Sequence, residues 1–189
     1  MTMTLSPRGA FALACHEGIV PGPYLDSVGV WTWGIGHTAA AGAPDPKALP
    51  RGVPADLDAA IGQALAVFRA DVQAYAAAVA RAVTVPLAQH EFDALVSFHY
   101  NTGAIAKASL VKALNRGDRE SAATGFLSWV KPPEVIGRRK KEQSLFRSGT
   151  YPAGPVNIWS VTLKGRVVFK PIRALTESDF LAAYTAAPF

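Results

Sequence analysis

The stretch CHEGIVPGPYLDSVGVWTWGIGHT, residues 15–38, determines how the rest of the chain is interpreted. It contains Glu17, then Asp26 nine positions later, then Thr32 after six more. Glycoside hydrolysis needs two carboxyl groups: one protonates the leaving oxygen, and the other serves the opposite face of the sugar. Glu17 and Asp26 are candidates for this pair, and the Thr32 hydroxyl is a candidate for holding an attacking water. The spacing by itself is more typical of two surface charges that flank a turn.

The residues before this stretch predict a helix that ends close to Glu17. Ser6 is a favourable N-cap residue and Pro7 suits the first helical position, while Gly18 is a typical helix terminator. Glu17 therefore falls in the last turn, where the helix dipole disfavours negative charge. Such a position favours the protonated carboxyl that a general acid needs.

The residues after the helix predict a small β-structure. Residues 24–35 are rich in β-branched and aromatic side chains and are interrupted by Gly29 and Gly34. This pattern predicts a hairpin or a three-stranded sheet. Asp26 and Thr32 would both lie on it.

The same motif resembles the signature of the phage-type lysozymes, the endolysin family whose best-known members come from T-even phages. The family pattern is E-G, then Y-x-D, then G-x-x-T-x-G-x-G-H, and it matches Glu17-Gly18, Tyr24-Leu25-Asp26 and the run from Gly29 to His37. The resemblance covers roughly residues 7–151. It implies an α+β, lysozyme-like fold that is mostly α-helical and carries a small β-hairpin or sheet lobe.

The resemblance also implies an activity and three catalytic roles. The chain would be an endolysin that hydrolyses the β-1,4 bond between N-acetylmuramic acid and N-acetylglucosamine in bacterial peptidoglycan. Glu17 would be the acid, Asp26 the base or charge stabiliser, and Thr32 the residue that orients the water. Inversion at the anomeric carbon is implied, because the best-known relatives invert.

Further roles follow from the resemblance, residue by residue. Thr38, Tyr100 and Ser109 match positions that contact the substrate. The resemblance implies no metal and no cofactor. His16, His37, His90 and His99 are too widely spaced in the sequence to indicate a metal site.

Two supporting pairs are implied in the same way. Arg138 matches an arginine near the start of the family's closing helix and is expected to pair with Glu17. His37 is expected to pair with Asp71 on a long helix, as a structural ion pair. Such a pair would lower the pKa of Asp71.

The middle of the chain predicts a series of helices. Apolar residues recur at three- and four-residue steps from Pro54 to about Arg81, which indicates one long helix. Further helices are predicted over residues 86–101, 109–115, 119–129 and 135–147, and a loop over residues 39–53. In the last helix, Arg139, Lys140 and Lys141 are predicted to form a basic, solvated face.

The C-terminal residues predict a hairpin and a helix. Residues 159–170 alternate around Lys164-Gly165, which indicates a two-residue turn, and Thr176 begins a capping pattern for a helix that reaches Tyr184. Because about 40 residues rarely hold a core alone, we expect a catalytic domain over 1–151 and an extension over 152–189 packed on it. An independent wall-binding module is the alternative.

Composition narrows the class of partner. The 189 residues carry a net charge of +5 and a pI near 9.5, so nucleic acid, acidic wall polymers and anionic lipid surfaces all fit. The resemblance selects peptidoglycan and not nucleic acid. Cys15 is the only cysteine, which excludes an internal disulfide.

The sequence also carries expectations about location. It has no signal peptide pattern and no apolar run near the roughly 20 residues that span a membrane. We therefore expect no stable membrane insertion and accumulation of a monomer in the host bacterial cytoplasm. A holin-type pore former would then give access to the wall. The source would be a phage, a prophage or a phage-derived particle.

Two other classes of protein remain open. A lytic transglycosylase on the same fold uses a single acid and no attacking water, and the presence of Asp26 and Thr32 argues against it. A non-catalytic, basic protein that binds walls or membranes would leave Glu17 dispensable. A wall-clearing assay on Glu17→Gln separates this last class from an enzyme.

Overall fold

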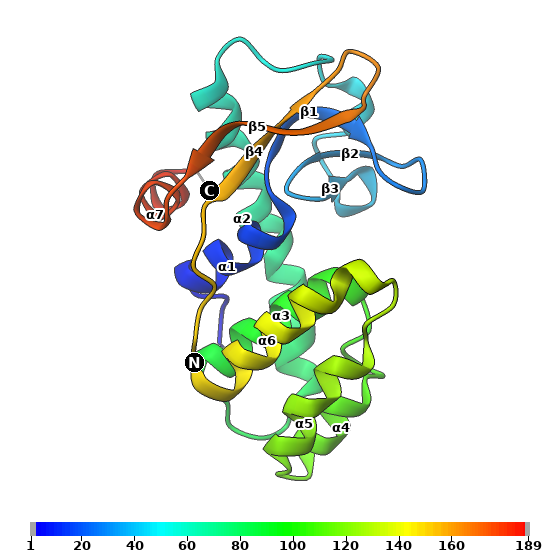
Figure 1. Ribbon diagram of the computed structural model, residues 1–189, viewed down its shortest axis with the longest axis vertical. Helices are drawn as coiled ribbons and strands as arrows, with labels where there is room; N and C mark the ends of the chain where they lie inside the picture. Colours follow the sequence, from blue (N-terminus) through cyan, green and yellow to red (C-terminus); the bar gives the residue numbers. More distant parts are fainter. Residues whose placement is uncertain (1–2, 188–189) are drawn as a thin grey trace. The chain divides into compact units, whose positions relative to one another are not determined.

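The computed structural model describes residues 3–187 and divides into two compact units. One unit comprises residues 3–12 with 72–153, and the other comprises residues 13–71 with 154–187. The described chain contains, in order, α1 (Pro7–Glu17), β1 (Val20–Leu25), β2 (Trp31–Gly34), β3 (His37–Thr38), α2 (Leu57–Ala82), α3 (Gln89–Thr102), α4 (Ser109–Asn115), α5 (Arg119–Gly125), α6 (Ile136–Ser148), β4 (Val156–Val161), β5 (Val167–Leu175) and α7 (Glu177–Ala186) (Figure 1).

The predicted combination of many helices with a small sheet is confirmed, and local chemistry explains where the helices begin. The long helix α2 starts at Leu57, three residues after the predicted Pro54, because the Asp56 carboxylate accepts the Ala59 N–H at 2.9 Å as an N-cap. Likewise α3 starts at Gln89 and not at residue 86. The loop predicted over residues 39–53 contains two short 3₁₀ helices, Ala39–Ala41 and Pro46–Ala48.

The unit that comprises residues 3–12 with 72–153, the helical unit, is organised around α3. Phe92, Leu95 and Phe98 of this helix are almost fully buried. The Phe98 ring packs edge-on against Phe126 at 5.5 Å and against Trp129 at 5.4 Å between ring centroids. Helix α6 runs alongside α3, as Figure 1 shows. The burial of these large rings supplies the main stabilisation of the unit.

A buried carboxylate anchors the ends of the helical unit to α3. Asp93 accepts the Ser6 backbone N–H at 3.0 Å, and it also accepts the Ser6 hydroxyl and, at 2.7 Å, the Tyr151 hydroxyl. Burial, together with this carboxylate, raises the pKa of Tyr151 to about 12. Tyr151 therefore remains a donor at ordinary pH, and Asp93 holds the N-terminus of α1 in place.

The unit that comprises residues 13–71 with 154–187, the sheet unit, contains the three strands that were predicted around the motif. Their order is β1-β2-β3 and both pairings are antiparallel. Tyr24 lies opposite Thr32, and Thr32 lies opposite Thr38, so these three residues form one row across the sheet. The buried Trp33 of β2 links this strand to β1, since its indole N–H donates to the Pro21 carbonyl at 2.9 Å.

The C-terminal residues add a second sheet and a helix to this unit. β4 and β5 form an antiparallel hairpin that lies beside β1 (Figure 1). The predicted two-residue turn is wrong: Thr162 N–H donates to the Arg166 carbonyl at 3.0 Å, which closes a three-residue loop, residues 163–165. The third loop residue, Gly165, has φ +75°, the left-handed conformation that such a loop requires.

Helix α7 packs on the part of α2 that belongs to the same unit. The predicted capping pattern is confirmed, because the Thr176 hydroxyl accepts the Asp179 N–H. The Tyr184 ring lies 6.3 Å from the Phe68 ring, and the Arg69 guanidinium lies 4.7 Å above it. Residues 154–187 thus share a unit with β1–β3. The predicted domain over residues 1–151 and extension over 152–189 stay a prediction.

Candidate active site

Glu17 is the last residue of α1 and is half-buried. The helix ends here because Gly18 adopts φ +70°, with its N–H donating to the Ala14 carbonyl at 2.8 Å. The predicted position of Glu17, in the last helical turn, is confirmed. Its side chain belongs to the same unit as Asp26 and Thr32.

Asp26 occupies the turn between β1 and β2. Its Oδ1 accepts the backbone N–H groups of Val28 at 3.0 Å and of Val30 at 2.8 Å, while its own N–H donates to the Val30 carbonyl at 3.0 Å. These bonds fix the direction of the carboxyl group. Within residues 3–187, no donor bonds the second oxygen, Oδ2. One oxygen therefore builds the turn and the other remains for a ligand or a water.

Thr32 is tied to the same turn through Val30. The Thr32 side chain is only 4% exposed, and its hydroxyl donates to the Val30 carbonyl at 3.1 Å. Because its single proton is used in this bond, the hydroxyl can still accept a hydrogen bond through its lone pairs. Its paired residue on β3 is Thr38, which is half-buried.

Tyr24 is a residue of this site to which sequence reasoning assigned no role. Burial raises the pKa of its phenol, and the negative charges of Glu17 and then of Asp26 raise it further. Both carboxyl groups therefore lie within electrostatic range of one phenol. The signal in the sequence was the Y-x-D spacing, because residues two apart in a strand point to the same side. The aromatic residue beside the two carboxyls could have been inferred from it.

The predicted pair between His37 and Asp71 is confirmed. His37 Nδ1 lies 2.8 Å from Asp71 Oδ2, and His37 Nε2 lies 2.9 Å from the Pro44 carbonyl oxygen. A carbonyl only accepts, so Nε2 carries a proton, and the bond between Nδ1 and Asp71 contains a second one. The imidazole is only 2% exposed and serves as a structural link within the sheet unit.

The expected direction of the Asp71 shift is wrong. Burial is the largest influence and raises the pKa of the Asp71 carboxyl, although the hydrogen bond and the charge of His37 oppose the shift. The sequence identified the partner and therefore predicted a lower pKa. It could not show how much water the carboxyl loses in the fold.

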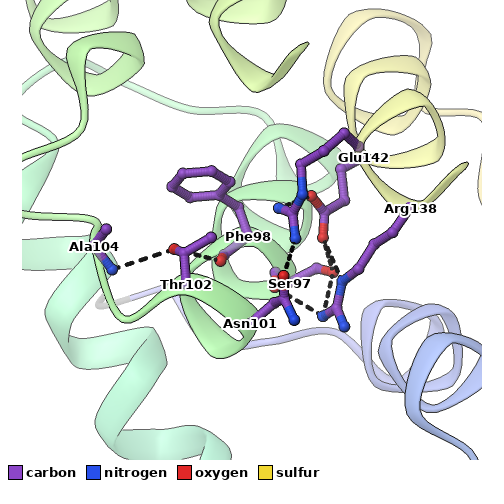
Figure 2. A network of polar contacts seen from close by, with 8 residues as sticks. Ser97, Phe98, Asn101, Thr102, Ala104, Arg138 and Glu142 are labelled. Carbon is purple, nitrogen blue, oxygen red and sulfur yellow. Dashed lines mark hydrogen bonds and ion pairs between the residues drawn. The ribbon is translucent and has the colours of Figure 1, made fainter. Parts of the chain in front are cut away.

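Arg138 belongs to the helical unit and takes part in a buried network there. Its Nε donates to Glu142 Oε1 at 2.9 Å, and its Nη2 donates to the Ser97 carbonyl at 3.0 Å. Figure 2 shows Arg138 and Glu142 of α6 facing Ser97 and Asn101 of α3. Glu142 is 1% exposed and also accepts the Ser97 hydroxyl at 2.7 Å. The predicted pair of Arg138 with Glu17 stays a prediction.

The basic, solvated face predicted for most of Arg139, Lys140 and Lys141 is confirmed at the two lysines, and Arg139 is the exception. Arg139 is fully buried, where it bonds Glu142 and the Asn101 side-chain oxygen, while Lys140 and Lys141 are exposed. The cause is Glu142, three residues further along the helix, which turns Arg139 inward to complete its own hydrogen bonds.

The two remaining candidates for substrate contact also belong to the helical unit. Tyr100 is half-buried on α3, and its ring lies 4.7 Å from that of Tyr75. Ser109 is exposed at the start of α4 and lines a hollow of about 410 Å³. These features are compatible with binding. The contacts of Thr38, Tyr100 and Ser109 with a substrate stay predictions.

Within residues 3–187, neither a metal-binding cluster nor a membrane-spanning helix is present. No group of three or more His, Cys, Asp or Glu side chains could hold a metal ion. In the same residues, no helix has the length and apolar character needed to cross a membrane.

With this geometry in view, known proteins identify the class of the chain. The phage lysozyme family matches residues 14–146. The endolysin of Salmonella phage P22 is 32% identical over 152 residues, which covers 77% of this chain and 99% of that protein. Among solved structures, the endolysin of the Escherichia coli O157:H7 phage FAHEc1 superposes with a TM-score of 0.67 at 31% identity, covering 80% of this chain and 98% of that one. The muramidase domain of SpmX from Asticaccaulis excentricus superposes with a TM-score of 0.63 at 28% identity, covering 77% of this chain and 98% of that one.

The chain therefore belongs to the phage lysozyme family. Its fold is the α+β, lysozyme-like fold that the motif implied. Its activity is that of a phage endolysin, a glycoside hydrolase of the muramidase type that degrades peptidoglycan and lyses the host.

Proposed function

We propose that the chain hydrolyses the β-1,4 bond between N-acetylmuramic acid and N-acetylglucosamine by direct displacement, with inversion at the anomeric carbon. Glu17 protonates the leaving oxygen. Asp26 takes a proton from the attacking water or stabilises the developing positive charge, and Thr32 orients that water. This division of roles follows the chemistry of inverting glycosidases, in which two carboxyl groups work on opposite faces of the sugar.

The observation that carries this proposal is that one unit holds Glu17 at the end of α1, Asp26 fixed in the β1–β2 turn, and Thr32 bonded to the same turn. The raised pKa of the Tyr24 phenol, to which burial and then both carboxyl groups contribute, supports their common location. An ordinary surface charge beside a turn would not be expected to act on the same buried phenol as a second carboxylate.

The local bonds of the turn support a water site between Asp26 and Thr32. Asp26 uses Oδ1 for the Val28 and Val30 N–H groups, so Oδ2 is available to accept a proton from water. The Thr32 hydroxyl donates to Val30 and can accept a hydrogen bond from the same water. A water held by two acceptors presents its own lone pair outward, which is the orientation that attack on a sugar carbon requires.

The remaining predicted roles belong to the same proposal. Thr38, Tyr100 and Ser109 contact sugar rings, and Arg138 orients Glu17 by an ion pair. The bond between His37 and Asp71 keeps the sheet unit in shape and takes no part in the chemistry. Replacement of Arg138 by Lys should lower kcat if its planar guanidinium orients Glu17, since lysine offers a single point charge in its place.

Mass analysis of the fragments released from purified peptidoglycan tests the reaction. The wild type should release fragments with reducing muramic acid ends, each heavier by one water than an anhydro end. Glu17→Gln should release none. Glu134→Gln is the matched control, because Glu134 is an exposed carboxyl at the start of a short helix in the other unit.

Each alternative outcome contradicts the proposal in a different way. Anhydro-muramic ends would show that no water attacks, as in a lytic transglycosylase. An active Glu17→Gln protein would show that another group protonates the leaving oxygen. Binding of walls with no release of fragments would indicate a non-catalytic protein.

We also propose that the chain acts as a monomer and waits in the host cytoplasm until a separate, holin-type pore former gives it access to the wall. Membership of the family supports this sequence of events. Expression in a bacterial host should leave the cells intact until the membrane is permeabilised. Lysis without permeabilisation would show that the chain crosses the membrane by its own means. Size-exclusion chromatography with light scattering tests the monomer.

A further inference from the structure

We propose that the C-terminal β4–β5 hairpin is part of the active-site scaffold and sets the separation between the Glu17 and Asp26 carboxyl groups. The inference rests on the catalytic roles proposed above for these two residues. All of the contacts that carry it lie within one unit, residues 13–71 with 154–187. The hairpin lies outside residues 14–146, the part of the chain that matches the family.

One end of the hairpin holds the chain immediately after Glu17. The Ile19 N–H donates to the Asn157 carbonyl at 2.9 Å, and the Trp159 N–H donates to the Ile19 carbonyl at 2.8 Å. These two bonds pair β4 in parallel with the residues that leave α1. The Trp159 indole lies against Gly18, so close that a Cβ atom added to Gly18 would lie 2.3 Å from the indole nitrogen. The backbone next to Glu17 is thus fixed by β4.

The other end of the hairpin holds the chain immediately before Asp26. The Leu25 N–H donates to the carbonyl of Gly165, in the β4–β5 loop, at 2.8 Å. The same glycine touches the Trp31 ring, because a Cβ atom added to Gly165 would lie 2.6 Å from two ring carbons. Arg51 stacks on this ring, with its guanidinium carbon 3.6 Å from the ring centroid. The loop therefore contacts Leu25, just before the turn that carries Asp26, and Trp31, just after it.

The strand between these two points needs outside support. β1 contains Pro21 and Pro23, which have no N–H to donate to a neighbouring strand. Its pairing with β2 is irregular between Val20 and Tyr24. A strand that makes few bonds of its own determines the distance between its ends poorly. β4 bonds the chain just before β1, and the β4–β5 loop bonds the end of β1. The hairpin therefore restrains the distance between the two ends of this strand.

The hairpin is paired at both ends and braced by ring packing near its middle. β4 and β5 pair from Val156 with Leu175 to Val161 with Val167, with an irregular register on either side of Trp159, where the Trp159 and Phe169 rings pack edge-on at 5.6 Å. The distance from the Ile19 contact to the Leu25 contact is therefore fixed by paired strands. Because a displacement of about 1 Å can cost 100-fold in rate, small errors in this distance would affect kcat directly.

Gly165→Ala is the variant that tests the inference. The new Cβ meets the Trp31 ring and displaces the loop from Leu25, so we expect kcat to fall about 10-fold or more while KM stays unchanged. Gly117→Ala is the matched control: Gly117 has a similar φ of +84°, and a Cβ atom there would meet nothing within 4 Å. Both variants carry the same backbone strain, so both should lower the melting temperature. Only Gly165→Ala should lower kcat.

The test measures kcat and KM of these variants on purified peptidoglycan, well below the melting temperature. The inference is overturned if folded Gly165→Ala keeps the wild-type kcat, or if Gly117→Ala loses as much. If Gly165→Ala does not fold, Trp159→Leu takes its place, since it keeps the β4 backbone bonds but withdraws the ring from both Gly18 and Phe169. An unchanged kcat in that variant overturns the inference, and a lower kcat at constant KM supports it.

Failure of the proposed function gives a different result. In that case the wild type releases no reducing muramic acid ends, or Glu17→Gln remains active, whatever the hairpin variants do. The inference then falls with the proposed function. If the wild type is active and Glu17→Gln is not, the hairpin variants test the inference alone.

Discussion

Asp26 and Glu142 are both carboxyl groups at fixed positions, yet their surroundings are opposite. Asp26 lies in a half-exposed turn and is held by two backbone N–H groups on one oxygen. Glu142 is 1% exposed and is bonded by Arg138, Arg139 and the Ser97 hydroxyl. Each belongs to a different unit. One carboxyl group is oriented but left open to react, and the other is fully satisfied.

The contrast shows which kind of carboxyl group carries chemistry in this protein. Burial raises the pKa of Glu142, although the charges of Arg138 and Arg139 and the Ser97 hydroxyl oppose the shift. A perturbed pKa is often taken as a sign of an active site, but ion-pair networks inside a fold perturb pKa values as well. Here the buried Glu142 carboxyl is structural, and Asp26, a catalytic candidate, keeps one oxygen available.

Of the variants that test this contrast between Asp26 and Glu142, Asp26→Asn should produce the largest effect on activity. Asparagine keeps an oxygen that can accept the Val28 and Val30 N–H groups, so the turn should persist, but it cannot take a proton from water. We expect kcat to fall by about 10²- to 10⁴-fold, the usual contribution of a general base. Stability measured by urea unfolding should change by less than about 0.5 kcal/mol. Retention of more than a tenth of the activity would remove Asp26 from the mechanism.

Glu142→Gln should give the reverse pattern. The substitution removes the buried carboxylate that Arg138 and Arg139 both bond, and breaking a buried ion pair from one side typically costs about 3–5 kcal/mol. Urea unfolding measures the loss, and Glu134→Gln, at an exposed position, is its control. Activity per folded molecule should remain near that of the wild type. A loss of less than about 1 kcal/mol would mean that the network is not a buried ion pair of the usual kind.

Asp71→Asn should have a smaller effect, one that depends on pH. An asparagine can still donate to His37 Nδ1, so about 1 kcal/mol should be lost, as for one hydrogen bond. The raised pKa of Asp71 means that the folded protein binds more protons than the unfolded chain between the two pKa values. The contribution of this titration is therefore complete below the unfolded pKa of about 3.9 and is lost as pH rises through the folded pKa.

The difference in unfolding free energy between the wild type and Asp71→Asn measures that sign. It should shrink as pH rises from about 3.9, the unfolded pKa, through the folded pKa of Asp71. A difference that grows over this range would mean that pairing with His37, and not burial, dominates the pKa of Asp71.

Lys140→Gln and Lys141→Gln should have the smallest effects. Both side chains are exposed on α6, next to the buried Arg139. We expect each to change the unfolding free energy by less than about 0.5 kcal/mol. Arg139→Gln, measured in parallel, should cost several times more. Equal effects at the three positions would contradict the assignment of Arg139 to the buried network.

Much of the fold could be predicted because its signals are local. Pro7 and Gly18 mark the ends of α1, and Thr176 with Asp179 marks the start of α7. The strands around Asp26 were indicated by residues within one short stretch, whereas the His37–Asp71 pair, 34 residues apart, was implied by the family resemblance. The starts of α2 at Leu57 and α3 at Gln89 were less evident, because a nearby proline offered an equally good helix start.

The rest depends on contacts between residues far apart in the sequence. The run Arg138 to Lys141 has the composition of a solvated face, but Arg139 is buried because Glu142 of α6 and the Asn101 side chain of α3 bond its guanidinium. The direction of the Asp71 shift depends on desolvation, which no spacing encodes. The bonds from the C-terminal hairpin to Ile19 and Leu25 are backbone bonds, for which the side chains give no signal.

Proton NMR of the freshly cleaved product tests the central claim most directly. The claim is that water, placed by Asp26 and Thr32, attacks the face opposite Glu17. The new reducing end should then appear first as the α-anomer and convert slowly to the equilibrium mixture. Inverting enzymes leave about 6.5–9.5 Å between their carboxyl groups for this water, whereas retaining enzymes bring them to about 5–5.5 Å. A product that appears first as the β-anomer would contradict the account, because it requires a covalent intermediate in place of direct attack by water.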